Sequence, residues 1–466
     1  MTQNKKYFLC GIGGSGMLPL AMLLKARGAD VTGSDRALDQ GRTSEKFDFL
    51  RDYGIELFPQ DGSGLMSREQ TIIASAAIED TVPDIAAALK NGSTRVTRAE
   101  ALADLFNGAD TRIGVAGTSG KSTTTAMIAW ILHAGGHAPT VMNGAVMKNF
   151  VTADNPFASA RAGDGPAFVS ELDESDGSIA LFTPDIAVLN NISLDHKSMD
   201  ELRALFSDFL AKARTPILNL DNDETRELLP SVRDTALTYT LEPDRWAVGA
   251  ALTAEAITPA AFGIHFEAVS KTARTPVDLK MPGRHNVSNA LAAILAAHAA
   301  GMSIEAAATA LNDFTGVKRR FEFVGTSNGK TVIDDFGHNP DKIAATLRTL
   351  KAFDGRLLVM FQPHGYGPLR KFGTELITTF VENLSGDDRL FMPEPVYFGG
   401  TVDRSSNSAD LVFEIKRQGI NADAFETRIA AGDAIVSAAS PGDRIIVMGA
   451  RDDTLSEFAA DLLERL

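Results

Sequence analysis

The feature that most constrains the fold is a six-residue glycine loop, Gly117 to Ser122, which connects an apolar strand to a helix. The strand is expected over residues 112–116 and the helix over residues 122–133. Glycines let the backbone wrap around phosphate oxygens, and the start of a helix adds the positive end of its dipole. The sequence therefore predicts a phosphate-binding α/β domain.

The loop reads Gly-Thr-Ser-Gly-Lys-Ser, in which Lys121 would reach nucleotide phosphates and the Ser122 hydroxyl would ligate Mg²⁺. Val115 stands where a general P-loop has its first glycine, so a tight turn without a ligand is the alternative. The strand before the loop and the helix after it favour phosphate binding, with Lys121 facing solvent. The candidate nucleotide-binding residues here are Gly117, Thr118, Ser119, Gly120, Lys121 and Ser122.

An acidic segment, residues 171–176, follows the strand expected over residues 167–170. Mg²⁺ requires hard oxygen ligands, and Glu171 leads this segment. A solvated acidic loop is the alternative, but the P-loop upstream favours a metal site. The next strand, residues 186–189, precedes His196. A lone histidine is usually structural, and a second Mg²⁺ is the hypothesis for His196.

A second glycine loop, Gly11-x-Gly13-x-x-Gly16, lies between an apolar strand and an apolar helix near the N-terminus. It fits a dinucleotide fingerprint, with Asp35 near the distance expected for a ribose contact. The pattern is weak by itself, because other diphosphates use the same backbone cradle and Asp35 could equally cap a turn. An NAD-dependent oxidoreductase remains an alternative, but it leaves the second loop and the acidic segment without a role.

Strand–helix alternation resumes twice after the first unit and predicts three α/β units in series. We expect boundaries in the linker at residues 107–110 and near Gly316. Residues 253–280 contain short strand-like runs and predict an antiparallel excursion. For 466 residues, about 100–200 residues per domain is consistent with three domains.

The net charge of −15 makes non-specific binding of nucleic acid unexpected, because phosphate contacts need a basic surface. No apolar run reaches the roughly 20 residues that span a bilayer, so we expect no membrane insertion. The N-terminal apolar stretch is too short for a secretory signal. Cys10 is the only cysteine, which favours a reducing compartment and predicts a cytoplasmic protein.

From residue 7 to about residue 451, the chain resembles the Mur ligases. The opening glycine loop and seven further segments occur in the order seen in that family, which is far more specific than any single motif. These segments are residues 117–122, 171–176, 191–196, 282–289, 316–321, 334–340 and 361–364.

The resemblance implies three domains: a Rossmann-like UDP-substrate domain (1–108), a P-loop ATP and Mg²⁺ domain (109–316) and a Rossmann-like acceptor domain (317–466). It implies an ATP-dependent ligase that joins an amino acid, L-alanine above all, to UDP-N-acetylmuramate through an acyl phosphate in peptidoglycan precursor synthesis. A peptide or another amine as acceptor, and a binding protein that has lost catalysis, are the alternatives. A monomer or homodimer is expected.

The resemblance also assigns roles residue by residue. Lys121, Glu171 and His196 would be catalytic, and Ser122, Glu171 and His196 would ligate metal. Further nucleotide contacts would be Asn286, Asn289, Arg320 and Asp335. Substrate contacts would be Gly11, Gly13, Gly14, Ser15, Gly16, Asp35, Ser75, His338 and His364.

The main departure from the family follows His364, where Gly365 and Pro368 replace two arginines of the acceptor pocket. The carboxylate of an amino acid needs a cation. We expect Arg370 to substitute from a re-routed loop, because Gly365 and Gly367 allow unusual backbone conformations.

Overall fold

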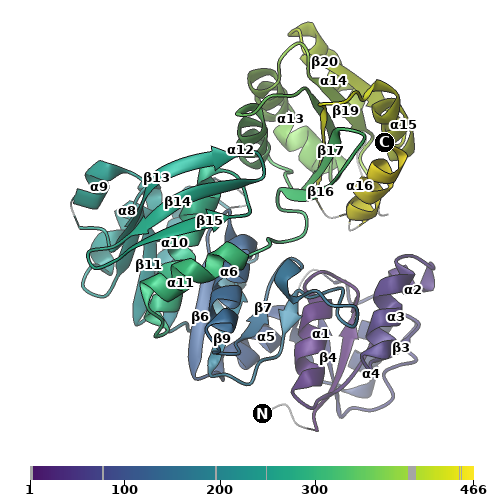
Figure 1. The fold of residues 1–466 in the computed structure, drawn as a ribbon. Helices are drawn as coiled ribbons and strands as arrows, with labels where there is room; N and C mark the ends of the chain where they lie inside the picture. The colour runs from purple at the N-terminus through teal and green to yellow at the C-terminus, as the bar shows by residue number, and fades with distance from the viewer. Residues whose placement is uncertain are drawn as a thin grey trace. The chain divides into compact units, whose positions relative to one another are not determined.

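The computed structural model describes residues 4–75, 78–194, 197–247, 249–396, 406–450, 452 and 454–466. Within these residues, three mostly parallel sheets define a three-domain α/β architecture, which confirms the predicted fold class (Figure 1). The chain divides into two compact units. The first contains most of residues 1–317, and the second contains residues 318–466 with the short segments 259–263 and 281–283.

The first sheet is parallel throughout, in the order β3-β2-β1-β4-β5. Its strands are β1 (Lys6–Cys10), β2 (Asp30–Ser34), β3 (Glu56–Phe58), β4 (Gln70–Ala74) and β5 (Arg95–Thr97). Its helices are α1 (Met17–Ala26), α2 (Arg36–Asp39), α3 (Ser44–Asp52), α4 (Pro83–Asn91) and α5 (Arg98–Asn107). The apolar run of α1 predicts a buried helix, and residues 17–24 are all buried.

The second sheet has the order β15-β14-β13-β12-β11-β10-β6-β9-β7-β8. Its strands are β6 (Thr111–Ala116), β7 (Thr140–Met142), β8 (Ala160–Arg161), β9 (Ala167–Glu171), β10 (Ile186–Leu189), β11 (Thr215–Asn219), β12 (Leu237–Thr240), β13 (Leu252–Ala260), β14 (Gly263–Val269) and β15 (Arg274–Leu279). The antiparallel pairing of β14 with β15 confirms the excursion expected over residues 253–280.

Helices α6 (Lys121–Ala134) and α10 (Arg284–Ala299) are the most deeply buried of this sheet, because both are apolar around most of their circumference. The others are α7 (Met199–Ala211), α8 (Asp223–Leu228), α9 (Pro243–Ala247) and α11 (Ile304–Ala310), with short 3₁₀ turns η1 (Lys148–Phe150), η2 (Ser178–Leu181), η3 (Leu229–Ser231) and η4 (Leu311–Asp313).

The third sheet has the order β16-β17-β21-β18-β19-β20, with only β16 antiparallel to its neighbour. Its strands are β16 (Glu322–Ser327), β17 (Lys330–Asp335), β18 (Leu357–Gln362), β19 (Arg389–Pro393), β20 (Asn421–Phe425) and β21 (Arg444–Gly449). Its helices are α12 (Pro340–Lys351), α13 (Tyr366–Asn383), α14 (Ser408–Arg417), α15 (Arg428–Ala438) and α16 (Thr454–Arg465).

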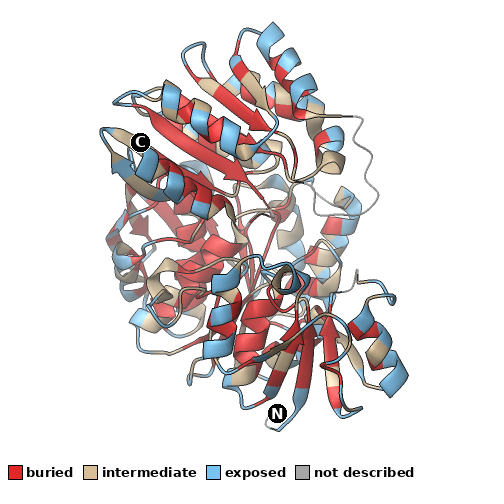
Figure 2. Cartoon of the chain, turned by 90° about the vertical axis from the view of Figure 1, so that its right-hand side faces the viewer, coloured by how far each residue is buried: buried red, intermediate tan, exposed pale blue. Residues whose placement is uncertain are grey.

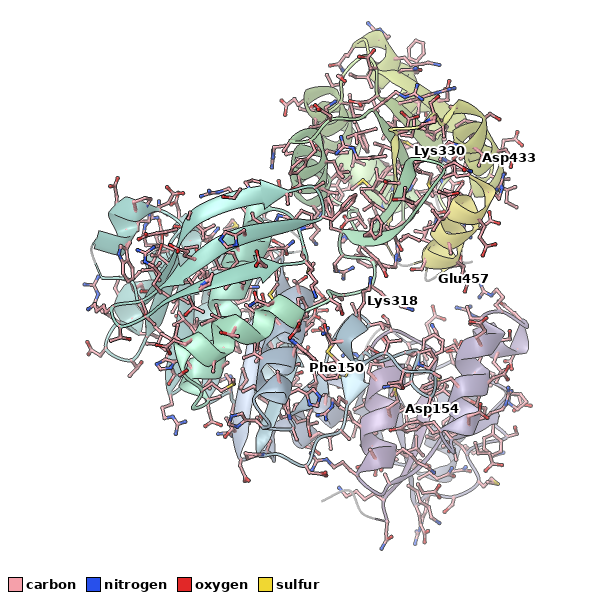
Figure 3. The ribbon with its side chains drawn as sticks, viewed as in Figure 1. Phe150, Asp154, Lys318, Lys330, Asp433 and Glu457 are labelled. Carbon is pink, nitrogen blue, oxygen red and sulfur yellow. The ribbon has the colours of Figure 1, made fainter. Side chains whose placement is uncertain are left out.

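Two apolar layers cover this sheet: α12 to α14 pack on one face, and α15 and α16 pack on the other. Figure 2 shows the buried central strands between helices whose outer residues are exposed. Figure 3 labels Asp433 on α15 and Glu457 on α16, together with Lys330 at the start of β17. Among the described residues, no helix is both long and apolar enough to cross a bilayer.

Candidate active site

The P-loop follows β6, whose neighbours in the sheet are β10 and β9. Because these strands are parallel, the loop, the segment after β10 and the end of β9 meet at one edge. Gly117 and Gly120 have φ values of +127° and +81°. A Cβ at Gly117 would lie 2.9 Å from the Asn191 carbonyl oxygen, and one at Gly120 would lie 2.5 Å from Asn289 Oδ1. Both glycines are therefore required by conformation and by close contact.

Asn191, in the segment after β10, holds the first half of the loop. Its Oδ1 accepts hydrogen bonds from the Ser119 N–H and the Thr118 hydroxyl, both at 2.9 Å. Its Nδ2 donates to the Ser119 carbonyl oxygen at 3.1 Å. Asn191 thus positions the loop, a role that no sequence signal assigns to it.

Lys121 does not face solvent as the sequence suggested. Its side chain is only 15% exposed, because Nζ donates to the Gly117 carbonyl oxygen at 2.7 Å and pairs with Glu174 Oε2 at 2.8 Å. Burial alone would lower the pKa of Lys121, but the carboxylates of Glu174 and Glu171 outweigh it and raise that pKa. The amine is therefore held protonated. The sequence could not identify Glu174 as its partner, because four carboxylates compete within one short segment.

Glu171 is the last residue of β9, and its Oε2 accepts a hydrogen bond from the Gly144 N–H at 2.9 Å. Burial alone would raise the pKa of Asp173, but hydrogen bonding from Ser175 and the charge of Lys121 lower it overall. In the described part of the chain, no three His, Cys, Asp or Glu side chains form a complete metal cage. Mg²⁺ usually keeps several waters and takes one or two carboxylates plus substrate phosphates, so the oxygen donors Glu171 and Ser122 fit it. His196 lies outside the described residues.

A cavity of about 230 Å³ joins the first glycine loop to this acidic edge within the first unit. It is lined by Ser15, Gly16, Arg98, Ala99, Leu102, Met142, Asn143, Gly144, Glu171, Leu172, Asp173, Ser178 and Phe182. The fold thus brings Ser15 and Gly16 to the same pocket as Glu171. The sequence, which placed them in different domains, gave no distance between them.

In the first glycine loop, Asp35 is a structural anchor. One of its carboxylate oxygens accepts the Gly13 N–H and the other accepts the Ala37 N–H, both at 2.8 Å. Asp35 therefore caps α2 and holds the loop, in agreement with the capping alternative. Ser75 follows β4 and is exposed at the carboxyl edge of the sheet, beside the end of β1.

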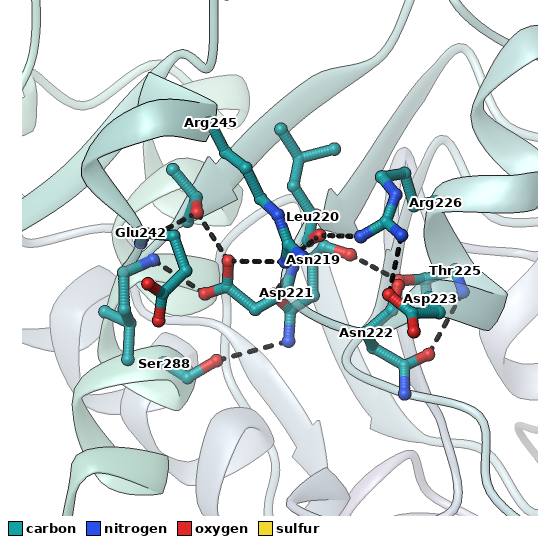
Figure 4. Close-up of polar contacts among 12 residues, drawn as sticks. Asn219, Leu220, Asp221, Asn222, Asp223, Thr225, Arg226, Glu242, Arg245 and Ser288 are labelled. Atoms are coloured by element: carbon teal, nitrogen blue, oxygen red, sulfur yellow. Dashed lines mark hydrogen bonds and ion pairs between the residues drawn. The ribbon is translucent and has the colours of Figure 1, made fainter. Parts of the chain in front are cut away.

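On the other side of the P-loop, α10 contributes Asn286 and Asn289. Both side chains are buried, and Asn289 Nδ2 donates to Asn286 Oδ1 at 3.2 Å. A polar network beside them links the ends of β11 and β12 (Figure 4). Asn219 donates to the Asn190 carbonyl oxygen at 3.0 Å, and Asp221 accepts the Leu241 N–H at 2.6 Å. This network, which the sequence did not reveal, braces the ends of β11 and β12 against the segment after β10, the strand that pairs with β6.

In the second unit, Asp335 ties three segments together. Its carboxylate accepts the N–H groups of Phe321 and Gly337, both at 2.8 Å, and the Thr346 hydroxyl at 3.1 Å. The neighbouring Arg320 stacks its guanidinium over the Phe336 ring at 4.2 Å.

His338 and His364 come together, with ring centroids 5.2 Å apart in an edge-to-face arrangement. His338 Nδ1 lies 2.9 Å from the Phe336 carbonyl oxygen, so Nδ1 must carry the proton. Burial, with the nearby charge of Lys342, lowers the pKa of His338 to about 3. His338 is therefore neutral, with Nε2 as a hydrogen-bond acceptor.

The re-routed loop expected to carry Arg370 is absent from the structure. Gly365 caps α13 with φ +146°, and the helix begins at Tyr366, so Arg370 is an exposed helical residue in its second turn. The expectation rested on the conformational freedom of Gly365 and Gly367, but Gly367 lies within the helix and Pro368 lies in its first turn, where proline is tolerated.

A parallel sheet whose central strand enters a phosphate loop defines the P-loop class of nucleotide-binding enzymes. Three family models match the chain: the Mur ligase family catalytic domain over residues 6–109, the Mur ligase middle domain over residues 115–297 and the Mur ligase glutamate ligase domain over residues 319–451. The chain belongs to the Mur ligase family, and it is therefore an ATP-dependent ligase.

Curated relatives match over nearly the whole chain. The UDP-N-acetylmuramate–L-alanine ligase of Mesorhizobium japonicum is 35% identical over 467 residues, and the enzyme of that name from Chromobacterium violaceum is 35% identical over 465 residues. Each alignment covers 96% of both chains. The crystal structure of UDP-N-acetylmuramate–alanine ligase from Thermotoga maritima has a TM-score of 0.78 at 24% identity and covers 98% of each chain, a likeness of fold.

Proposed function

We propose that this ligase joins L-alanine to the carboxylate of UDP-N-acetylmuramate, at the expense of ATP, in the synthesis of peptidoglycan precursors. The observation that carries the proposal is the pocket in which Ser15 and Gly16 of the first glycine loop lie with Glu171. A sugar nucleotide held by that loop would present its carboxylate toward the phosphate-binding edge. The near-full-length relatives of that name support the choice of substrates.

We also propose domain boundaries at 108/109 and 316/317, which the ranges of the three family models support. The first glycine loop and Ser75 would contact the sugar nucleotide, and the P-loop with Asn286 and Asn289 would contact ATP. Arg320 and Asp335 would be further nucleotide contacts, and His338, His364 and Arg370 would contact the amino acid. The single cysteine favours a cytoplasmic location.

The reaction begins with a carboxylate, which is a poor electrophile until it acquires a leaving group. Transfer of the terminal phosphoryl group of ATP to a carboxylate oxygen gives an acyl phosphate and ADP. The amine then attacks the carbonyl carbon, a tetrahedral intermediate forms, and inorganic phosphate leaves as the amide bond is completed.

Within this reaction, Lys121 offsets charge on the transferring phosphoryl group, since its amine is held protonated at the end of the loop. A phosphate that binds there competes with Glu174 for Nζ. Mg²⁺, held by Ser122, Glu171 and His196, would supply further positive charge to the phosphates. Neutral His338 offers Nε2 to an N–H of the amino group.

The test combines product analysis with trapping. Phosphate release should require ATP, UDP-N-acetylmuramate and L-alanine together. Hydroxylamine added in place of L-alanine should capture the acyl phosphate as a hydroxamate of the sugar nucleotide. Phosphate release with a peptide but not with L-alanine, or without any sugar nucleotide, would overturn the proposal.

A further inference from the structure

Arg98 is a charged residue whose side chain has no evident structural task. It is the first residue of α5, but the start of that helix is held by a capping box between Thr97 and Glu100. Among the described residues, the Arg98 guanidinium has neither a hydrogen-bond partner nor an ion-pair partner. The side chain is only partly exposed and lines the 230 Å³ pocket. A half-buried cation in that position is ready to bind an anion.

Two observations place this cation in the pocket between the glycine loop and the acidic edge. The Arg98 side chain runs alongside Gly16, since a Cβ at Gly16 would lie 3.0 Å from Arg98 Cδ and 3.2 Å from Nε. On the other side, Arg98 is near enough to Asp173 for their charges to interact. A Cβ at position 16 would therefore push the Arg98 side chain away from the loop by a few tenths of an ångström.

The charge of the pocket shows why such a cation is needed. Glu171 and Asp173 line the pocket, and Arg98 is the only lysine or arginine among the described residues that line it. An anionic substrate that enters would be repelled by both carboxylates. The planar guanidinium can donate two parallel hydrogen bonds to a carboxylate or a phosphate, which a lysine amine cannot do.

We propose that Arg98 pairs with an oxyanion of the bound sugar nucleotide, supplied by its diphosphate or by the carboxylate that becomes activated. This inference rests on the proposed function. In this proposal Arg98 contributes to the affinity for the sugar nucleotide, in addition to the contacts that the glycine loop makes.

Calorimetric titration of the full-length protein tests the pairing and identifies the oxyanion. Arg98→Gln should weaken binding of UDP-N-acetylmuramate by about 10- to 100-fold, as expected for loss of a charge-assisted hydrogen bond. UDP-N-acetylglucosamine carries the diphosphate without the carboxylate. An equal loss for both ligands assigns Arg98 to the diphosphate, and a loss confined to UDP-N-acetylmuramate assigns it to the carboxylate.

Three further variants separate this role from a structural one. Arg95→Gln removes a charge on β5 that is already paired with exposed Asp80, and should leave both affinities within about twofold of wild type. Arg98→Lys should retain part of the affinity. Gly16→Ala should displace the guanidinium and weaken binding while Arg98 remains.

The outcomes are distinguishable. If the wild-type protein binds neither sugar nucleotide, the proposed function fails. If wild type binds and Arg98→Gln binds equally well, the pairing is wrong and the proposed function stands. Should Arg98→Gln unfold, Arg98→Lys and Gly16→Ala decide the question, and wild-type affinity in both would overturn the inference.

Discussion

At the scale of single residues, the pair between Lys121 and Glu174 links catalysis to stability. Both side chains are largely buried, and removal of the amine leaves a carboxylate without its partner. Breaking a buried pair from one side costs roughly 3 kcal/mol. Lys121→Ala should therefore abolish phosphate release and also lower the free energy of unfolding by about that amount, as measured by urea denaturation.

The double variant Lys121→Ala/Glu174→Gln separates the two effects. A neutral amide needs no counter-charge, so stability should recover while activity does not. Wild-type stability in Lys121→Ala alone would show that the pair is not formed, and normal turnover would remove the P-loop assignment.

The lowered pKa of His338 predicts how the stability of the fold depends on pH. Its pKa is lowered by burial from 6.5 to about 3, so between these values the unfolded chain binds a proton that the folded chain does not. Stability must therefore fall as pH drops from 6.5 toward 3. His338→Gln should make the dependence of the unfolding free energy on pH shallower in this window. Equal slopes in wild type and His338→Gln would show that His338 titrates normally.

At the scale of elements, α6 offers a matched pair of glycines. Gly120 precedes the helix and Gly136 follows it, both at φ +81°. A Cβ at Gly120 would meet Asn289 Oδ1 at 2.5 Å, whereas Gly136 has nothing within 4 Å. Each alanine substitution should cost about 1–2 kcal/mol of stability through its backbone conformation. Only Gly120→Ala should also weaken ATP binding, by about tenfold, or 1.4 kcal/mol. Equal ATP affinities in the two variants would mean that contact with Asn289 does not shape the loop.

Arg370 on helix α13 is the residue that we expect to pair with the carboxylate of the amino-acid acceptor. A zwitterionic amino acid presents a carboxylate that must be paired once it is desolvated. Arg370→Ala should raise the Michaelis constant for L-alanine by about tenfold or more and leave that for ATP nearly unchanged. Lys371→Ala, at the adjacent exposed position, is the control. An unchanged constant for L-alanine in Arg370→Ala would remove Arg370 from the acceptor site.

At the scale of the whole molecule, the two compact units can be followed separately. Both tryptophans, Trp130 and Trp246, lie in the first unit. UDP-N-acetylmuramate should stabilise only the unit that binds it. Thermal unfolding followed by tryptophan fluorescence should therefore shift upward with this ligand, while a part of the circular dichroism change should not shift. A single transition that moves equally by both probes would show that the units unfold together.

Local patterns in the sequence determined the strands, the helices and the two glycine loops. The run from Met17 to Ala26 predicts α1, and the spacing around Gly117 predicts a phosphate loop, because hydrophobic period and glycine position act over a few residues. The order of the motifs predicts the family, because each motif is itself a short run of residues that can be read locally. The expected loop around Arg370 was wrong because the chain is helical from Tyr366 onward, so the flexibility that Gly365 and Gly367 allow is not used to re-route it.

Tertiary structure alone decided which side chains meet. It pairs Lys121 with Glu174 rather than with another acidic neighbour, it seats Asn289 against Gly120, and it brings Arg98 beside Gly16. These partners come from different strands and helices, and their distances follow from strand order and packing, which no local pattern encodes. The sequence therefore determines which chemical groups are available. The order of strands in the parallel sheets determines which of those groups lie together at one edge, where they can act on a substrate.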